Sequence, residues 1–234
     1  MACYQLVLDR RLGEYVFPDG WVVMAAGNPA SEKGVHFSMP YPLRNRFMHF
    51  TLDPDVKDWT TWAIQHKIVP ELISFIRFKT ELLLGEKPKD SNAWATPRAW
   101  ANVSTFVEPW LKAQNDLSPI FTEAVAGIVG EGAASEFIGF LRLYKNLPSV
   151  EQILAAPETT MVPSEHEPSA SIAIATGLGR VINDKNIVQA AKYLNRMEPE
   201  FHTLAMYDAA ERDPKIAKTK SFIEFGVRFD KVLA

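Results

Sequence analysis

A change in the spacing of apolar residues near position 56 constrains the fold of this chain more than any other feature. From Val56 onward, apolar residues recur three and four positions apart, as they do along one face of an α-helix. The first two such faces consist of Trp59, Trp62, Ala63, Leu72, Ile73 and Ile76. Proline residues and polar stretches divide the pattern into separate helices. Beyond residue 85 the predicted helices span residues 97–110, 117–129, 133–144, 171–180, 186–196, 200–212 and 221–232.

Before residue 56 the pattern is mixed. Residues 2–11 have helical spacing, and residues 13–17 and 21–26 flank a Pro-Asp-Gly turn, which predicts a β-hairpin. Residues 47–52 alternate like one further short strand. The fold class predicted is therefore an α/β N-terminal part followed by a mainly α-helical region. A polar stretch with three prolines at residues 156–169 is the predicted internal boundary, which gives the regions 1–55, 56–155 and 156–234.

Composition excludes several classes of function. The formal charge of -3 and the pI of 6.0 give no global reason to expect nucleic acid or an anionic membrane as a partner. A single cysteine and five scattered histidines offer no metal-ligand spacing, so no metal site is expected. No apolar stretch approaches the roughly 18 residues that a membrane-spanning helix needs. We therefore expect a cytoplasmic protein with no membrane segment.

Three polar residues stand out as candidate site residues at the ends of elements. Asn28 follows the apolar segment 21–26, where an amide could hold a water against a phosphate or could simply turn the chain before Pro29. Arg44 and Arg46 precede the segment 47–52. They could stabilise a short helix as cations near its C-terminus, or one of them could project into a neighbouring subunit's nucleotide site.

Arg98 is unusual because it follows Thr96 and Pro97, which are typical residues for the start of a helix. A positive charge in the first turn opposes the helix dipole by roughly 0.3 to 1 kcal/mol. Either a bound anion such as phosphate or a surface ion pair with a nearby acid could compensate for it. Two glycine pairs, in residues 130–132 and 177–180, lack the features of phosphate-binding loops. They are expected to be helix ends or close helix contacts.

The joint order of these residues resembles AAA+ ATPases, and the closer resemblance is to the MoxR type, in a bacterial and phage subgroup. There a hairpin precedes sensor 1, as in GEYVFPDGWVVMAAGNP, and a Gly- and Pro-containing loop leads to an Arg-Phe pair, as in SEKGVHFSMPYPLRNRF. The resemblance implies that Asn28 is sensor 1, Arg46 is the arginine finger and Arg98 in TPR is sensor 2. Arg44 is grouped with Arg98 as a candidate nucleotide-binding residue, but the resemblance gives it no defined role. The motifs cover residues 1 to about 110.

For the complete enzyme, the resemblance implies ATP and Mg²⁺ as cofactors. It also implies a homo-oligomeric, hexameric ring and a chaperone-like remodelling activity. The implied partner is a protein client, for example one with a von Willebrand A-type domain.

The other half of such a site is missing from these 234 residues. They contain no GxxxxGK[ST] phosphate loop and no apolar run that ends in Asp-Glu. The resemblance would place both before Met1, which is expected to correspond to an internal methionine. The chain alone is therefore expected neither to bind ATP tightly nor to hydrolyse it. Three hypotheses follow: part of a MoxR-type ATPase, the second piece of a split ATPase, or a non-enzymatic helical interaction protein.

Overall fold

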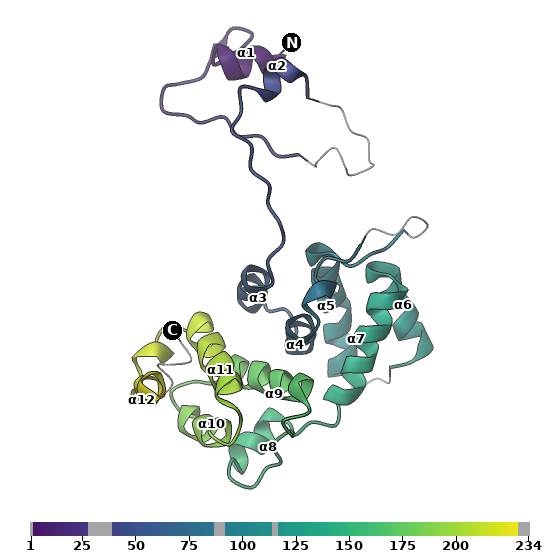
Figure 1. The fold of residues 1–234 in the computed structure, drawn as a ribbon, viewed down its shortest axis with the longest axis vertical. Coiled ribbons are helices and arrows are strands. Elements are labelled where there is room, and N and C mark those ends of the chain that lie inside the picture. The colour runs from purple at the N-terminus through teal and green to yellow at the C-terminus, as the bar shows by residue number, and fades with distance from the viewer. Residues whose placement is uncertain (1, 28–38, 87–91, 114–116, 229–234) are drawn as a thin grey trace. The chain divides into compact units, whose positions relative to one another are not determined.

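A computed structural model provides the structure of the chain and describes residues 2–27, 39–86, 92–113 and 117–228. The chain divides into two units, residues 1–53 and 54–234 (Figure 1). The first unit contains short elements joined by irregular segments, and the second consists of packed helices.

The N-terminal unit begins with helix α1 (Ala2–Leu8), close to the helix predicted over residues 2–11. Strands β1 (Arg11–Leu12) and β2 (Tyr15–Val16) follow and pair antiparallel, with Arg11 opposite Val16. Helix α2 (Tyr41–Arg44) lies after the undescribed residues 28–38.

The position predicted for the hairpin is wrong. The chain turns at Gly13, whose φ of 60° suits a tight two-residue turn, rather than at residues 18–20. Residues 21–27 then form no strand. The Arg10 side chain contacts the backbone just before and at the start of this segment. Its Nη2 donates to the carbonyl oxygens of Pro18, at 3.0 Å, and Trp21, at 2.7 Å.

The strand predicted over residues 47–52 is also not formed. This segment has no regular structure. The backbone of residues 48–54 makes no backbone hydrogen bond to any described residue. A strand exists only as part of a hydrogen-bonded ladder, and no strand of the described residues pairs with this segment.

The helical unit confirms the helical pattern. Its first group of elements is α3 (Val56–Gln65), α4 (Pro70–Phe78), a 3-10 turn (Thr80–Leu82), α5 (Pro97–Lys112), α6 (Pro119–Val129) and α7 (Glu131–Tyr144). Its second group is α8 (Val150–Ala155), α9 (Pro168–Val181), α10 (Ile187–Leu194), α11 (Pro199–Arg212), a 3-10 turn (Ile216–Lys218) and α12 (Lys220–Arg228). Residues 145–149 join the two groups, and residues 156–167 connect α8 to α9 within the second group.

Side-chain caps explain where several of these helices begin. Asp55 caps α3, Thr96 caps α5, Ser118 caps α6, and Ser149 forms a reciprocal capping box with Gln152 at α8. In each case a side-chain oxygen accepts a hydrogen bond from a backbone N–H that the helix leaves unpaired. The starts of these helices are therefore encoded locally.

Two apolar clusters form the core of the helical unit. One gathers side chains of α3 to α7, with Phe75, Trp100 and Phe137 fully buried and in mutual ring contact. The other gathers side chains of α8 to α12. Helix α9 packs against both α4 and α11, and Figure 1 shows it beside α11. The small side chains of α9 permit this close packing between the two clusters.

Candidate functional site

Two of the candidate arginines lie in the N-terminal unit. Arg44 is the last residue of α2, as its interpretation as a helix-ending cation predicted, and its guanidinium carbon lies 6.0 Å from the centroid of the Tyr41 ring. Arg46 is exposed, and its Nη1 donates to the carbonyl oxygen of Pro42. Asn28 lies outside the described residues.

Arg98 lies in the helical unit, in the first turn of α5, as predicted. Thr96 is the N-cap, its Oγ1 accepting from the Ala99 N–H at 3.0 Å, and Pro97 is the first helical residue. The Arg98 side chain is exposed, and among the described residues it has neither a hydrogen bond nor an ion pair. Within that part of the chain no acid compensates for its charge, and the alternative of an anion ligand stays open.

Contacts from three places hold the turn that carries Arg98. The indole Nε1 of Trp59 in α3 donates to the Pro97 carbonyl oxygen at 3.3 Å. The indole Nε1 of Trp100 donates to the Leu82 carbonyl oxygen at 2.7 Å. The backbone N–H of Gly85 donates to the carbonyl oxygen of Ala95 at 3.0 Å, just before the helix. The backbone under Arg98 is therefore fixed although its side chain is exposed.

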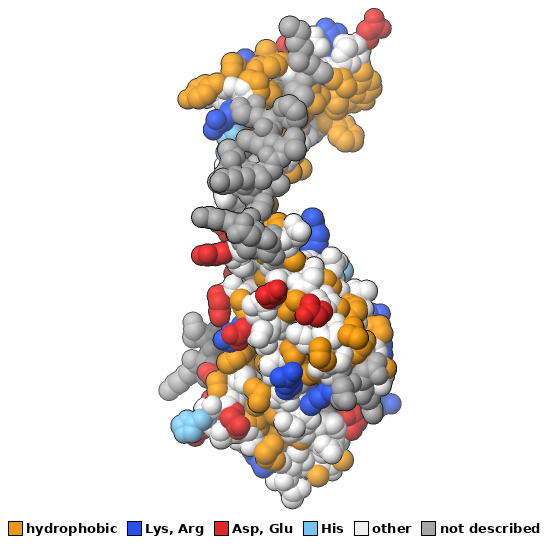
Figure 2. Space-filling view, turned by 90° about the vertical axis from the view of Figure 1, so that its right-hand side faces the viewer, with side chains coloured by type: hydrophobic (Ala, Val, Ile, Leu, Met, Phe, Trp, Pro, Cys, Tyr) orange, Lys and Arg blue, Asp and Glu red, His pale blue; other side chains and the backbone are white. Residues whose placement is uncertain are grey.

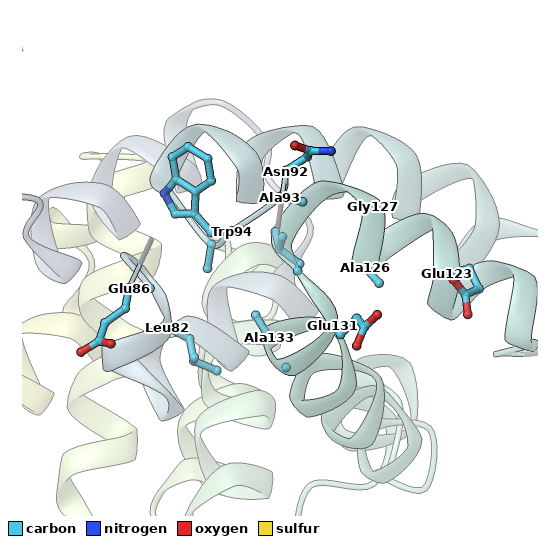
Figure 3. A pocket seen from close by; sticks show the side chains of 15 residues that line it. Leu82, Glu86, Asn92, Ala93, Trp94, Glu123, Ala126, Gly127, Glu131 and Ala133 are labelled. Atoms are coloured by element: carbon cyan, nitrogen blue, oxygen red, sulfur yellow. The ribbon is translucent and has the colours of Figure 1, made fainter. Parts of the chain in front are cut away.

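An open pocket of about 830 Å³ lies beside the segment that leads into α5 (Figure 3). Its wall includes Trp94, and three carboxylates belong to its lining: Glu86, Glu123 and Glu131. None of the described lining residues is lysine or arginine. Negative charge of this kind opposes the binding of a polyphosphate. The pocket is therefore a poor nucleotide site as it stands.

The two glycine motifs are what the sequence predicts them to be. Gly130, with a φ of 86°, ends α6 and precedes α7. Gly179 lies inside α9, where an added Cβ would come within 2.6 Å of the Asp208 Cβ and 3.1 Å of the Ala205 carbonyl oxygen. The first is a helix end and the second is a close helix contact, so neither cradles a phosphate.

The described residues would need several ligating side chains close together to hold a metal ion. No three of their His, Cys, Asp or Glu side chains come together in a way that could hold a metal ion. Arg44 and Arg46 belong to one unit and Arg98 to the other.

A largely buried polar contact that links α4, α9 and α11 was not predicted from the sequence. Arg77 in α4 donates through Nη1 to Oδ2 of Asp208 and through Nη2 to Oδ1, each at 2.6 Å, and through Nη1 to Thr176 Oγ1 at 2.9 Å. Burial raises the pKa of the Asp208 carboxyl, and the Arg77 guanidinium partly counteracts that rise. The sequence signal for this contact was a charged residue on the apolar face of each helix. The two charged residues are 131 positions apart, so the sequence does not pair them.

Further polar groups lie near the packing of α4, α7 and α9. Arg180 Nη1 donates to the Ile68 carbonyl oxygen. Burial raises the pKa of the Glu71 carboxyl, although the positive charge of Arg180 lowers it, and burial also raises the pKa of the Tyr144 hydroxyl. These groups connect helices, and no described pocket opens onto them.

No helix in the described part of the chain is both long and apolar enough to cross a membrane. Comparison of the chain with protein-family models, with curated proteins and with solved structures found no match. Its function is therefore inferred from its residues and their geometry.

Proposed function

We propose that this chain is the sensor, arginine-finger and lid portion of a AAA+ ATPase of the MoxR type. Its complete form couples ATP hydrolysis to the remodelling or assembly of a partner protein and works as a homo-oligomeric ring. The phosphate loop and the acids that bind Mg²⁺ come from polypeptide outside these 234 residues. The ordered motifs around Asn28, Arg46 and Arg98 are the basis of this proposal.

The exposed apolar surface of the N-terminal unit supports the proposal. Among the described residues of this unit only Leu43 is a buried hydrophobic side chain, whereas twelve large hydrophobic side chains are exposed (Figure 2). The twelve are Leu8, Leu12, Tyr15, Val16, Trp21, Val22, Met24, Met39, Tyr41, Met48, Phe50 and Leu52. Many large exposed apolar side chains in one small unit favour an interaction there. In this proposal, strands from polypeptide outside these 234 residues cover them.

Residues 48–53 support the same interpretation in more detail. Met48, Phe50 and Leu52 are 80%, 79% and 93% exposed, and they alternate with polar residues. This is the period-two pattern of a strand with one apolar face. The pattern and the unpaired backbone together fit a strand whose neighbouring strands belong to another polypeptide segment.

In this proposal the arginines have different tasks. Arg98 binds a phosphate of the nucleotide held by its own subunit, and its exposure at a helix N-terminus favours an anion there. Arg46 acts at the neighbouring subunit's nucleotide, where a guanidinium stabilises charge that develops during phosphoryl transfer. Asn28 orients the attacking water. No task is assigned to Arg44.

Calorimetry on the isolated chain provides the first test. We expect no micromolar binding of ATP to residues 1–234 and no measurable turnover, because most phosphate contacts lie in the missing portion. Micromolar affinity, or hydrolysis that survives repurification, would overturn this part of the proposal.

Reconstitution provides the second test. The in-frame DNA before the codon for Met1 and the neighbouring genes are searched for GxxxxGK[ST] and an apolar strand that ends in Asp-Glu. The polypeptide so identified is produced joined to this chain or together with it, and ATP hydrolysis is measured. Finding neither sequence would favour a non-enzymatic helical interaction protein.

Arginine variants of the active assembly separate a finger from an ordinary surface residue. Arg46→Ala should abolish turnover and largely spare nucleotide binding, because a finger acts on the transition state. Arg142→Ala, which removes an exposed arginine of α7, is the matched control and should retain full turnover. An unchanged kcat in the Arg46 variant would remove that residue from the proposed role.

A further inference from the structure

We propose that Trp59 is a positioning residue for Arg98. Its indole N–H, donated to the Pro97 carbonyl oxygen, fixes the first turn of α5 and so directs the Arg98 guanidinium toward the nucleotide. The inference rests on the proposed function in one respect, that Arg98 binds a phosphate.

The geometry around Pro97 leaves the turn few ways to move. The proline ring fixes φ at Pro97, and Thr96 Oγ1 holds the N–H of Ala99 at 3.0 Å. The hydrogen bond from Trp59 links this turn to a different helix, α3. Its Nε1 lies 3.3 Å from the Pro97 carbonyl oxygen, and the two residues are 38 positions apart in the sequence. Arg98 lies between Pro97 and Ala99, so these contacts fix the direction in which its Cα–Cβ bond points.

Trp59 and Trp100 make different contributions to this turn. Trp100 is fully buried, and its ring contacts Phe75 and Phe137, so it belongs to the core itself. Trp59 belongs to the same apolar cluster and is 7% exposed, but its hydrogen bond ends on the residue next to Arg98. Replacing Trp59 by phenylalanine removes the donor and retains an aromatic ring. Because Trp59 is also buried in the cluster, the effect of the lost donor is identified by where it acts, at residues 99–101 and not at α9.

The position of Trp59 in α3 gives the contact a further consequence. Helix α3 begins at Val56, three residues after the end of the N-terminal unit at Asp53, and Asp55 caps it through the Asp58 N–H at 2.9 Å. Trp59 lies in the first turn of this helix. A shift of α3 would therefore be transmitted to the turn that carries Arg98.

Hydrogen exchange in the full chain tests whether the hydrogen bond from Trp59 to Pro97 stabilises the first turn of α5. Trp59→Phe should speed exchange of the backbone amides of residues 99–101 about 3- to 10-fold, as expected for the loss of one hydrogen bond. Amides of α9 should keep their wild-type rates. Trp62→Phe is the matched control, because Trp62 lies in the same helix, is 40% exposed and has no recorded side-chain hydrogen bond in the described chain. Unchanged exchange in the Trp59 variant, or an equal increase in the control, would overturn the proposal.

Kinetics of the reconstituted ATPase test whether the hydrogen bond from Trp59 affects activity through Arg98. Trp59→Phe should lower kcat/KM by less than Arg98→Ala does, and the double variant should be no worse than Arg98→Ala alone. A purely structural loss would instead multiply with the arginine loss. Wild-type kinetics for Trp59→Phe beside an impaired Arg98→Ala would overturn the positioning role alone. Full activity of Arg98→Ala would overturn the proposed function of Arg98 and this inference with it.

Discussion

Arg77 and Asp208 form a two-point ion pair between α4 and α11, with both N–O distances at 2.6 Å and side chains only 13% and 7% exposed. Thr176 of α9 accepts a third hydrogen bond from the same guanidinium. One arginine therefore connects three helices that come from both apolar clusters of the helical unit.

Removing one partner of this pair should be costly. Asp208→Ala leaves a guanidinium partly buried without its carboxylate, and loss of a buried partner typically costs about 3–5 kcal/mol. Urea unfolding followed by the helical circular-dichroism signal measures the change. Glu136→Ala breaks the more exposed Lys79–Glu136 pair, at 3.3 Å, and should cost less than about 1 kcal/mol. Equal losses in the two variants would contradict the role assigned to the buried pair.

Gly179 should not tolerate even a methyl group. An added Cβ would lie 2.6 Å from the Asp208 Cβ, so Gly179→Ala should push α9 from α11 and cost about 1–3 kcal/mol. Gly139→Ala is the control, since Gly139 lies in α7 and its added Cβ meets nothing within 4 Å. That variant should be stabilised by up to about 1 kcal/mol, because alanine favours a helix more than glycine does. The same unfolding measurement distinguishes the two.

The carboxyl of Glu71 should make stability depend on pH. Burial raises its pKa above 4.5 in the folded chain, so the folded state binds the proton more tightly than the unfolded state. The unfolding free energy contributed by this group therefore falls as the pH rises from about 4.5 through the raised pKa. Glu71→Gln should gain stability over wild type across that window.

An exposed carboxyl provides the comparison for Glu71. The hydrogen bond from Lys112 lowers the pKa of Glu108, so its contribution has the opposite sign and diminishes as the pH falls. The unfolding free energy of Glu71→Gln, Glu108→Gln and wild type is measured from pH 4 to pH 8. A gain in the Glu71 variant that does not vary with pH would show that the carboxyl is not desolvated as described.

The two units should differ in stability. A fragment of residues 54–234 should remain folded and monomeric, because both apolar clusters lie inside it. Residues 1–234 should self-associate as concentration rises, through the exposed apolar side chains of the first unit. Sedimentation velocity compares the two, and Phe50→Asp in the longer chain should reduce association. Equal behaviour of chain and fragment would show that these side chains are covered.

The sequence anticipates those helices whose signals are local. The cap at Thr96 and the apolar spacing are read within a few residues of sequence, and the structure shows caps of the same local kind at Asp55 and Ser118. The same locality places Arg98 in a first helical turn and Arg44 at a helix end. The short helix α8 was missed, although its capping box at Ser149 and Gln152 was a usable signal.

What the sequence by itself determined is therefore the helical unit's element order, because caps, prolines and apolar period act within one or two turns. Only the tertiary structure decided that Arg77 meets Asp208, that Gly179 lies against α11, and that Trp59 reaches the turn of Arg98. These contacts join residues tens of positions apart, and no local pattern encodes them. The strands predicted at residues 21–26 and 47–52 failed for the same reason, since a strand forms only when another strand pairs with it.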